Sequence, residues 1–185
     1  MTDHQLMTAV REGDCDRLGP LFDRHHRKLY NYFLKHTGDR LSSEDLVQDV
    51  FLRILKYRES YAENGSGFEV WLYTIARNVR FDHYRRKGPR MQPIEDAEVI
   101  AVNTPAPDKV LETDDDLGRL RLALDSLSED DREVIIMSRY QGMKYNEIGR
   151  IMGSTEGAVK VRIFRALKQL AEKFNSLAKE NIHEL

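Results

Sequence analysis

The sequence predicts an all-α protein made of two small helical domains joined by a flexible acidic linker. Apolar residues recur every three or four positions along most of the 185 residues, which is the period of a buried helix face. No segment alternates between apolar and polar residues for long, so strands are not expected. Four of the five prolines fall between Pro89 and Pro107, where they would interrupt a helix. We therefore predict an N-terminal domain over residues 1–87, a Pro-containing linker over 88–117, a C-terminal domain over 118–176 and a tail over 177–185.

The N-terminal domain is expected to hold a short helix from about His4 to Glu12 and three longer helices. Each longer helix carries an apolar stripe that would face a common core. The run from Ser42 to Asp45 predicts the start of the second helix, because hydroxyl caps and first-turn acids favour a helix N-terminus. A loop at residues 64–67 precedes the third helix. The stripes are Leu18, Leu21, Phe22, Leu29, Tyr32 and Phe33; Leu46, Val47, Val50, Phe51, Ile54 and Leu55; and Phe68, Trp71, Leu72, Ile75, Ala76 and Val79.

The formal net charge of −2 hides an uneven distribution along the chain. Residues 77–90 hold six basic residues and one acid, and residues 139–173 hold eight basic residues and three acids. Between them, residues 94–117 hold eight acids and one base. This pattern predicts two basic faces suited to nucleic acid, separated by an acidic segment that lacks fixed structure on its own.

The cellular compartment follows from what the sequence lacks. Cys15 is the single cysteine and has no partner for a disulfide, which favours a reducing cytoplasm. The first twenty residues contain no apolar stretch of signal-peptide length, and no window reaches the roughly 18 apolar residues of a membrane span. We therefore expect a cytoplasmic protein without membrane insertion.

The C-terminal domain has the spacing of a helix-turn-helix. Ser128 can cap a helix that runs to about Tyr140, and a glycine-containing turn at Gly153 separates the next two helices. In the last helix, Thr155 is the expected N-cap. Its inward positions are Val159, Ile163, Ala166 and Leu170, and its outward positions are Gly157, Ala158, Val161, Arg165 and Lys168. Small residues in the first turn would let this helix enter a major groove, with Lys160 and Arg162 beside it on phosphates. The alternative is a helical hairpin with a solvated basic surface.

Two further helix faces are candidates for binding. Tyr73, Arg77, Arg80, Tyr84 and Lys87 follow one line of the third helix, and such mixed rings and cations suit single-stranded nucleic acid. An ordinary exposed helix face is the alternative for this line. The outward side of the second helix is mixed polar with one leucine, for which a solvated face is the alternative. Its residues are Asp45, Gln48, Asp49, Leu52 and Lys56.

No motif for catalysis or for a metal is present in the sequence. The chain has no P-loop, GxSxG, HExxH or EF-hand pattern. His25, His26, His36 and His83 have no acid or thiol cluster at ligand spacing. We therefore expect no catalytic residue, no metal and no cofactor.

Two blocks of the sequence resemble a known family. SSEDLVQDVFLRIL followed by GFEVWLYTIARNVRFDHYRRK resembles region 2 of bacterial sigma factors of the sigma-70 family. DSLSEDDREVIIMSRYQGMKYNEIGRIMGSTEGAVKVRIFRAL resembles region 4. The order of the two blocks is that of the extracytoplasmic-function, or group 4, type. The resemblance implies a subunit that binds core RNA polymerase, recognises and melts promoter DNA, and is not itself an enzyme, in a stress or envelope response. It also implies an anti-sigma factor as a partner.

The resemblance assigns three sets of residues by position. The set that would dock on core polymerase is Asp45, Leu46, Gln48, Asp49, Phe51 and Leu52, of which Leu46 and Phe51 would support the face from the core. The set for the −10 element is Asn64, Ser66, Tyr73, Arg77, Asn78, Arg80, Tyr84 and Arg85, with residues 61–69 as a loop that captures a flipped base. The set for the −35 element is Thr155, Glu156, Gly157, Lys160, Val161, Arg162, Arg165 and Lys168.

Three positions depart from the family pattern. Ser128 stands where proline is frequent, and Lys144 stands where a capping hydroxyl is usual, so the helix from Tyr145 is expected to start less firmly. Gly149 replaces a usual alanine at the helix crossing, which should keep the packing and weaken the helix by up to about 1 kcal/mol.

Two other functions stay open at this point. One is a free-standing helix-turn-helix regulator, and the other is a small nuclease or recombinase, for which Asp82 alone is insufficient.

Overall fold

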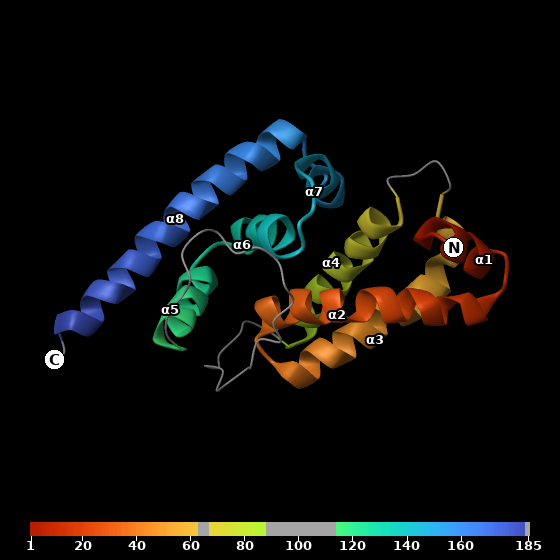
Figure 1. Cartoon of the computed structure of the whole chain (residues 1–185), viewed down its shortest axis with the longest axis horizontal. Coiled ribbons are helices and arrows are strands. Elements are labelled where there is room, and N and C mark those ends of the chain that lie inside the picture. Colours follow the sequence, from red (N-terminus) through yellow and green to blue (C-terminus); the bar gives the residue numbers. More distant parts are fainter. Residues whose placement is uncertain (63–66, 88–113, 184–185) are drawn as a thin grey trace. The chain divides into compact units, whose positions relative to one another are not determined.

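The computed structural model describes residues 1–62, 67–87 and 114–183, and within these ranges it confirms the all-α prediction. Every regular element there is a helix, as Figure 1 shows. The chain divides into two compact units, one formed by the N-terminal helices together with Arg150–Met152, and the other by the remaining C-terminal helical residues. None of the helices described is long and apolar enough to cross a membrane.

The N-terminal unit begins with α1 (Asp3–Arg11), which lies within one residue of the predicted bounds. Thr2 caps this helix, because its hydroxyl accepts the backbone N–H of Gln5 and the Gln5 side chain accepts the backbone N–H of Thr2. The inward side of α1 is apolar and buried, so the helix is docked rather than free. Its buried residues are Leu6, Met7 and Val10.

Helix α2 (Leu18–Thr37) follows a short 3-10 turn, η1 (Cys15–Arg17), and ends at Gly38. Helix α3 (Arg40–Tyr57) begins before the predicted start at Ser42. Its cap is Asp39, whose carboxylate accepts the Ser42 backbone N–H at 2.9 Å. Ser42 and Ser43 are buried in the first turn, and so the prediction that they cap the helix was wrong.

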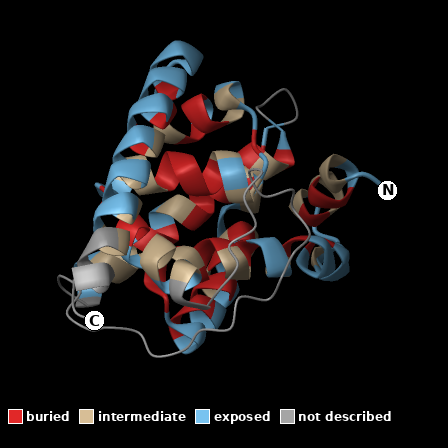
Figure 2. Ribbon diagram, turned by 60° about the vertical axis from the view of Figure 1, so that its left-hand side comes forward, coloured by how far each residue is buried: buried red, intermediate tan, exposed pale blue. Residues whose placement is uncertain are grey.

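A second short turn, η2 (Arg58–Ser60), follows α3, and helix α4 (Phe68–Lys87) completes the unit. Both α2 and α4 pack against α3. Figure 2 shows buried residues on the facing sides of these helices. The three predicted stripes supply most of this core; Phe22 is 38% exposed, and Leu18, Leu55 and Trp71 are half-buried.

The C-terminal unit begins earlier than predicted. Helix α5 (Asp114–Asp125) includes residues 114–117, which the sequence had placed in the linker. The remaining linker residues, 88–113, lie outside the described ranges. Helix α6 (Glu129–Ile135) continues as a π-helical turn, η3 (Ile136–Tyr140), to the predicted end.

Hydrogen bonds fix the starts of two helices at the positions that depart from the family pattern. The Ser128 hydroxyl accepts the backbone N–H of Asp131 at 3.2 Å, so serine caps α6. Helix α7 (Tyr145–Met152) starts after Lys144, whose backbone N–H donates to the Glu147 carboxylate at 2.8 Å. Glu147 therefore supplies part of the capping that a hydroxyl at position 144 would give.

Helix α8 (Glu156–His183) is the longest helix described, and it extends through most of the predicted tail. Both α5 and α6 pack against α8. The turn between α7 and α8 lies directly against Gly149: a Cβ atom added there would be 2.7 Å from the backbone oxygen of Ser154. The Ser154 backbone N–H also donates to the Gly149 carbonyl, at 2.7 Å. The prediction that Gly149 keeps the packing at the helix crossing is therefore confirmed, and the close approach shows why glycine rather than alanine stands here.

Candidate nucleic-acid and docking interfaces

The outward face of α8 is the most completely predicted of the candidate surfaces. Thr155 caps the helix, because its hydroxyl accepts the Ala158 backbone N–H at 3.2 Å. The inward residues Val159, Ile163 and Ala166 are buried, which fixes the rotation of the helix. All eight residues assigned to the −35 element are exposed: Thr155, Glu156, Gly157, Lys160, Val161, Arg162, Arg165 and Lys168. The arrangement presents cations beside small and apolar side chains, as a helix in a major groove requires.

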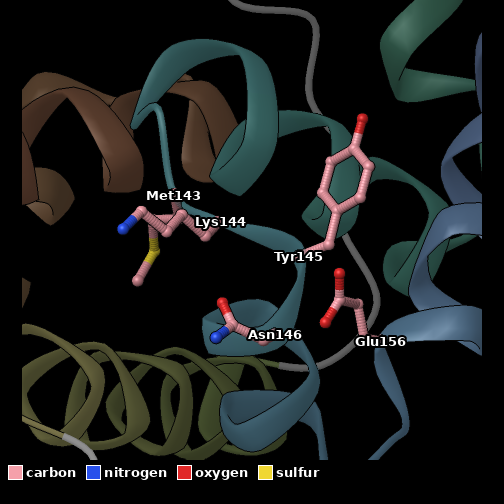
Figure 3. A pocket seen from close by; sticks show the side chains of 5 residues that line it. All are labelled: Met143, Lys144, Tyr145, Asn146 and Glu156. Atoms are coloured by element: carbon pink, nitrogen blue, oxygen red, sulfur yellow. The ribbon is translucent and has the colours of Figure 1, made fainter.

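A shallow hollow lies where α7 and α8 begin. Figure 3 shows the side chains around it, which are Met143, Lys144, Tyr145, Asn146 and Glu156. The Glu156 carboxylate is in the first turn of α8, where it stabilises the helix but repels phosphate. The cations of the following turns are therefore better placed than this end of α8 to contact a DNA backbone.

Arg162 differs from Lys160, Arg165 and Lys168 because, among the described residues, it forms ion pairs with acids of its own unit. Its guanidinium lies 3.1 Å from the Asp130 carboxylate and 3.7 Å from that of Asp131. Both acids belong to the first turn of α6, so the pair links α6 to α8. Arg162 is exposed as predicted, but part of its charge is already neutralised before DNA approaches.

Phe164 belongs to the same outward face and was missed by the sequence reasoning. Its side chain is 73% exposed, and that of Val161 is 50% exposed. A helical wheel could have found it, because Phe164 lies three residues after Val161 and opposite the buried stripe. The face therefore has an apolar centre with Lys160, Arg165 and Lys168 around it.

The outward face of α3 also matches its prediction. Asp45 and Gln48 are exposed, Asp49 is half-buried, and Leu52 is 63% exposed. Leu46 and Phe51 are buried beneath them, which agrees with a supporting place in the core. The exposed residues present carboxylates and an amide next to an apolar side chain, a mixture suited to a protein partner.

The predicted line of rings and cations along α4 is wrong at Tyr73 and Arg80, and the side chain of Lys87 lies outside the described residues. Tyr73 is fully buried, and its ring meets that of Tyr32 on α2 at 5.5 Å between centroids. Burial raises the pKa of the Tyr73 hydroxyl well above its usual range, so the side chain stays neutral. Arg80 is 1% exposed, with its guanidinium 4.6 Å from the Phe81 ring centroid and 5.7 Å from that of Tyr84. Neither Tyr73 nor Arg80 can contact DNA without unfolding part of the core.

The exposed side of α4 follows a different line. Asn78 and Arg85 are exposed, and Trp71 is half-buried at the same side of the helix, since residues seven apart are two turns apart. Arg85 pairs with Asp82, which also binds Arg53 of α3 at 2.7 Å. Hydrogen bonds from Arg53 and Arg85 hold the pKa of Asp82 below its usual value.

The other members of the −10 set lie in mixed surroundings. Arg77 is half-buried over the Phe81 ring at 4.7 Å, and the Tyr84 hydroxyl donates to the His36 carbonyl at 2.7 Å. Asn64 and Ser66 lie outside the described residues. The predicted loop over residues 61–69 is shorter than expected at its C-terminal end, because α4 begins at Phe68.

No group of three or more histidines, cysteines, aspartates or glutamates in the described part of the chain could hold a metal ion. The Asp3 carboxylate lies 2.6 Å from His25, but this pair also includes Arg24 and forms a contact between α1 and α2.

Comparison with known families and proteins agrees with this geometry. The family description "Sigma-70 region 2" matches residues 21–90, and "Sigma-70, region 4" matches residues 117–170. The ECF RNA polymerase sigma factor BldN of Streptomyces coelicolor is 31% identical over 170 residues, which are 90% of this chain and 64% of that protein. The RNA polymerase sigma factor CarQ of Myxococcus xanthus is 31% identical over 177 residues, covering 94% of this chain and 98% of that protein.

Two solved structures have a similar fold. CnrH, in complex with the cytosolic domain of CnrY, matches with a TM-score of 0.71 and 22% identity, over 94% of this chain and 97% of that chain. The sigma factor RpoE of Bartonella quintana, in complex with the anti-sigma factor NepR, matches with a TM-score of 0.66 and 26% identity, over 85% and 96%. The chain therefore belongs to the sigma-70 family and is a sigma factor of the extracytoplasmic-function type, a class of transcription initiation factors that recognise promoters.

Proposed function

We propose that this sigma factor binds core RNA polymerase and directs it to promoters, with residues 1–87 acting at the polymerase and the −10 element and residues 118–176 at the −35 element. The exposed, cation-rich face of α8 carries this proposal. The buried apolar residues on the opposite side of the helix fix which side is exposed. The partners are core polymerase and promoter DNA. Bond formation belongs to the polymerase, and the sigma factor acts in the cytoplasm by binding alone.

At the −35 element, α8 enters the major groove. Arg165 reaches a base edge or a phosphate, Lys160 and Lys168 contact phosphates, and Val161 lies against the bases. Arg162 contributes less than its charge suggests, because Asp130 and Asp131 already neutralise it in part. The duplex contacts therefore depend mainly on three cations of this helix.

At the −10 element, the exposed side of α4 provides the contacts. Asn78 reads or holds the strand, and Arg85 with Arg77 supplies positive charge near phosphates. Tyr84 has a secondary place, since its hydroxyl is engaged with the His36 carbonyl. This leaves a smaller set of DNA contacts than the eight residues assigned from the sequence.

The outward face of α3 docks on core polymerase. Its exposed carboxylates favour a basic partner surface, and Leu52 adds apolar area at the centre. We further propose that an anti-sigma factor covers such faces when the protein is inactive, in a stress or envelope response. This is supported by the similarity to a sigma factor whose structure was solved with an anti-sigma factor.

The experiment that tests the function is a pull-down with core polymerase followed by transcription from a promoter library. Replacing Asp45 and Asp49 with lysine should weaken assembly, since charge reversal opposes a basic partner. The matched control replaces Asp16 and Glu59 with lysine, because both are exposed elsewhere in the same unit and give the same change in charge. Exposed substitutions of this kind usually change stability by less than about 0.5 kcal/mol.

The outcomes separate the candidate functions. Loss of core binding in the Asp45 and Asp49 variant alone supports the assigned docking face. Equal binding by both variants contradicts that assignment. If the unchanged chain binds promoter DNA tightly but never core polymerase, it is a free-standing regulator and the proposed function is wrong.

A further inference from the structure

Helix α1 lies before residues 21–90, which match region 2, yet it is built into the same unit. Its three large apolar residues, Leu6, Met7 and Val10, are almost fully buried, at 2% exposure or less. Its polar residues are also engaged in specific contacts with residues far along the chain. The contacts of His4 and Arg11 are with Tyr61, and those of Asp3 are with α2.

Two residues of α1 hold Tyr61. The Nδ1 atom of His4 lies 2.9 Å from the Tyr61 hydroxyl, within hydrogen-bond distance. The Arg11 guanidinium donates to the Tyr61 backbone carbonyl at 3.2 Å. Tyr61 is only 3% exposed, so its hydroxyl needs a partner inside the protein, and His4 supplies one.

Tyr61 in turn packs against the first turn of α4. Its ring meets the Trp71 ring edge-on at 5.2 Å between centroids and the Phe68 ring at 6.2 Å. Such aromatic pairs have preferred geometries, so a shift of one ring favours a shift of the others. The three rings form one cluster at the N-terminal end of α4, and the half-buried Trp71 brings it to the surface.

Asp3 forms a second connection, between α1 and α2. Its carboxylate lies 2.7 Å from Arg24 and 2.6 Å from His25 on α2. The His25 ring lies 5.2 Å from the Phe68 ring. Helix α1 thus contacts the aromatic cluster through Tyr61 and through His25.

The position of this cluster affects the exposed side of α4. Trp71 and Asn78 are seven residues apart, which places them two turns apart on one side of the helix, at about 10 Å. Because two turns of a helix move as a rigid element, a displacement of Trp71 also changes the direction of the Asn78 side chain. The cluster therefore sets the orientation of the α4 side that faces the −10 element in the proposed function.

We propose that α1 is a positioning element for promoter opening, in which His4 and Arg11 hold Tyr61 and thereby set Trp71 and the exposed side of α4. The proposal rests on the proposed function of this chain as a promoter-opening sigma factor. His4, Arg11 and Tyr61 are positioning residues, since they act through Trp71 and touch no DNA themselves. A purely structural role would instead change stability and would affect closed and opened promoters equally.

Two conservative variants test the proposal. Tyr61→Phe removes the hydroxyl that His4 contacts and keeps the ring, and Arg11→Gln removes the donor to the Tyr61 carbonyl. The controls are Tyr57→Phe and Arg17→Gln, because Tyr57 is 48% exposed and Arg17 pairs with Asp14 rather than with Tyr61. Circular dichroism and thermal melting show whether each variant keeps its fold.

The assay uses holoenzyme on a promoter that carries a fluorescent base analogue in the −10 element. We expect each test variant to form about fivefold fewer open complexes on duplex promoter, the effect of one ordinary hydrogen bond on an equilibrium. On a promoter with a pre-opened bubble, and in affinity for core polymerase, both variants should match the unchanged protein. The control variants should behave like the unchanged protein throughout.

Three results would overturn the proposal: no defect, an equal defect on duplex and pre-opened promoter, or the same defect in the controls. If Tyr61→Phe lowers the melting temperature, the result with Arg11→Gln is decisive, because Arg11 is partly exposed and its other contact is a long surface ion pair with Glu12 at 4.0 Å. Failure of the unchanged holoenzyme to open any promoter would refute the proposed function itself. That outcome is distinct from a working holoenzyme whose α1 variants show no defect.

Discussion

Replacement of Gly149 by alanine tests the close contact between α7 and the turn before α8. Alanine in a helix is favoured over glycine by about 1 kcal/mol, so propensity alone predicts a more stable protein. The added Cβ would however lie 2.7 Å from the Ser154 carbonyl oxygen and 3.4 Å from the Thr155 carbonyl carbon. Both are backbone atoms, so relief requires the turn to move. Overpacking of this kind costs about 1 to 3 kcal/mol.

The two terms predict that Gly149→Ala lowers the stability of the C-terminal unit by about 1 kcal/mol, with an upper limit near 2 kcal/mol. For a unit of this size, about 1 kcal/mol corresponds to a fall of roughly 5 °C in melting temperature. The turn that moves also carries the cap of α8, so binding of the −35 duplex should weaken as well. Gly157→Ala is the matched control for stability, because a Cβ there meets nothing within 4 Å, and duplex binding is compared with the unchanged chain because Gly157 belongs to the −35 set.

The assay is thermal unfolding followed by circular dichroism and by tryptophan fluorescence on the same sample. Trp71 is the single tryptophan and lies in the N-terminal unit, so its fluorescence reports a part of the chain that the change should not affect. Hydrogen exchange of residues 145–170 locates the loss in α7 and α8. A higher melting temperature for Gly149→Ala, or equal behaviour of the two glycine variants, would refute the reasoning.

Two other predictions concern charge. Replacing Asp130 and Asp131 with asparagine removes the acidic partners of Arg162, so the full chain should bind −35 duplex more tightly at low salt. The slope of the logarithm of the binding constant against the logarithm of the salt concentration, measured by fluorescence anisotropy, should steepen by about 0.9 for one added phosphate contact. An unchanged slope would contradict this prediction. Burial of Asp3 opposes its ionisation, but hydrogen bonds from Arg24 and His25 outweigh this and hold its pKa below the usual value of 3.8. Ionised Asp3 therefore stabilises α1 above pH 3.8, and this contribution is lost as the pH falls through the lower folded-state pKa. Hydrogen exchange of residues 3–11 should show that loss in acid, and Asp3→Asn should remove the pH-dependent step; a step that persists in the variant would assign it to another group.

The sequence predicts α8 well because, within the described part of the chain, the residues on one side of this helix are exposed. Its inward positions repeat at helical spacing, and the residues opposite them are exposed as the wheel requires. The same reasoning places the outward face of α3 correctly, with Leu52 at the surface and Phe51 below it. The helical period therefore suffices to predict which residues are exposed when a helix buries only one apolar stripe.

Helix α4 differs because its buried side is much wider than one stripe. Leu72 and Val79 face the core as predicted, but Tyr73 and Arg80 are buried beside them. A wheel assigns tyrosine and arginine to the surface by their polarity, and nothing in the sequence shows that Tyr32 of α2 lies within reach of the Tyr73 ring. The contacts that decide the orientation of α4 join residues about forty positions apart, which period and composition do not encode.

The same limit applies to charge counted along the chain. Of the cations assigned to the DNA-binding faces, Arg80 is buried against rings, Arg85 pairs with Asp82, and Arg162 pairs with two acids of α6. A buried cation cannot reach a phosphate, and a paired cation must first give up its acidic partner. Binding a phosphate therefore gains less free energy for these cations than for a cation without an ion pair. The affinity for duplex DNA and its salt dependence should thus be set by the exposed cations that form no ion pair. In the described part of α8, these include Lys160, Arg165 and Lys168, at the exposed surface.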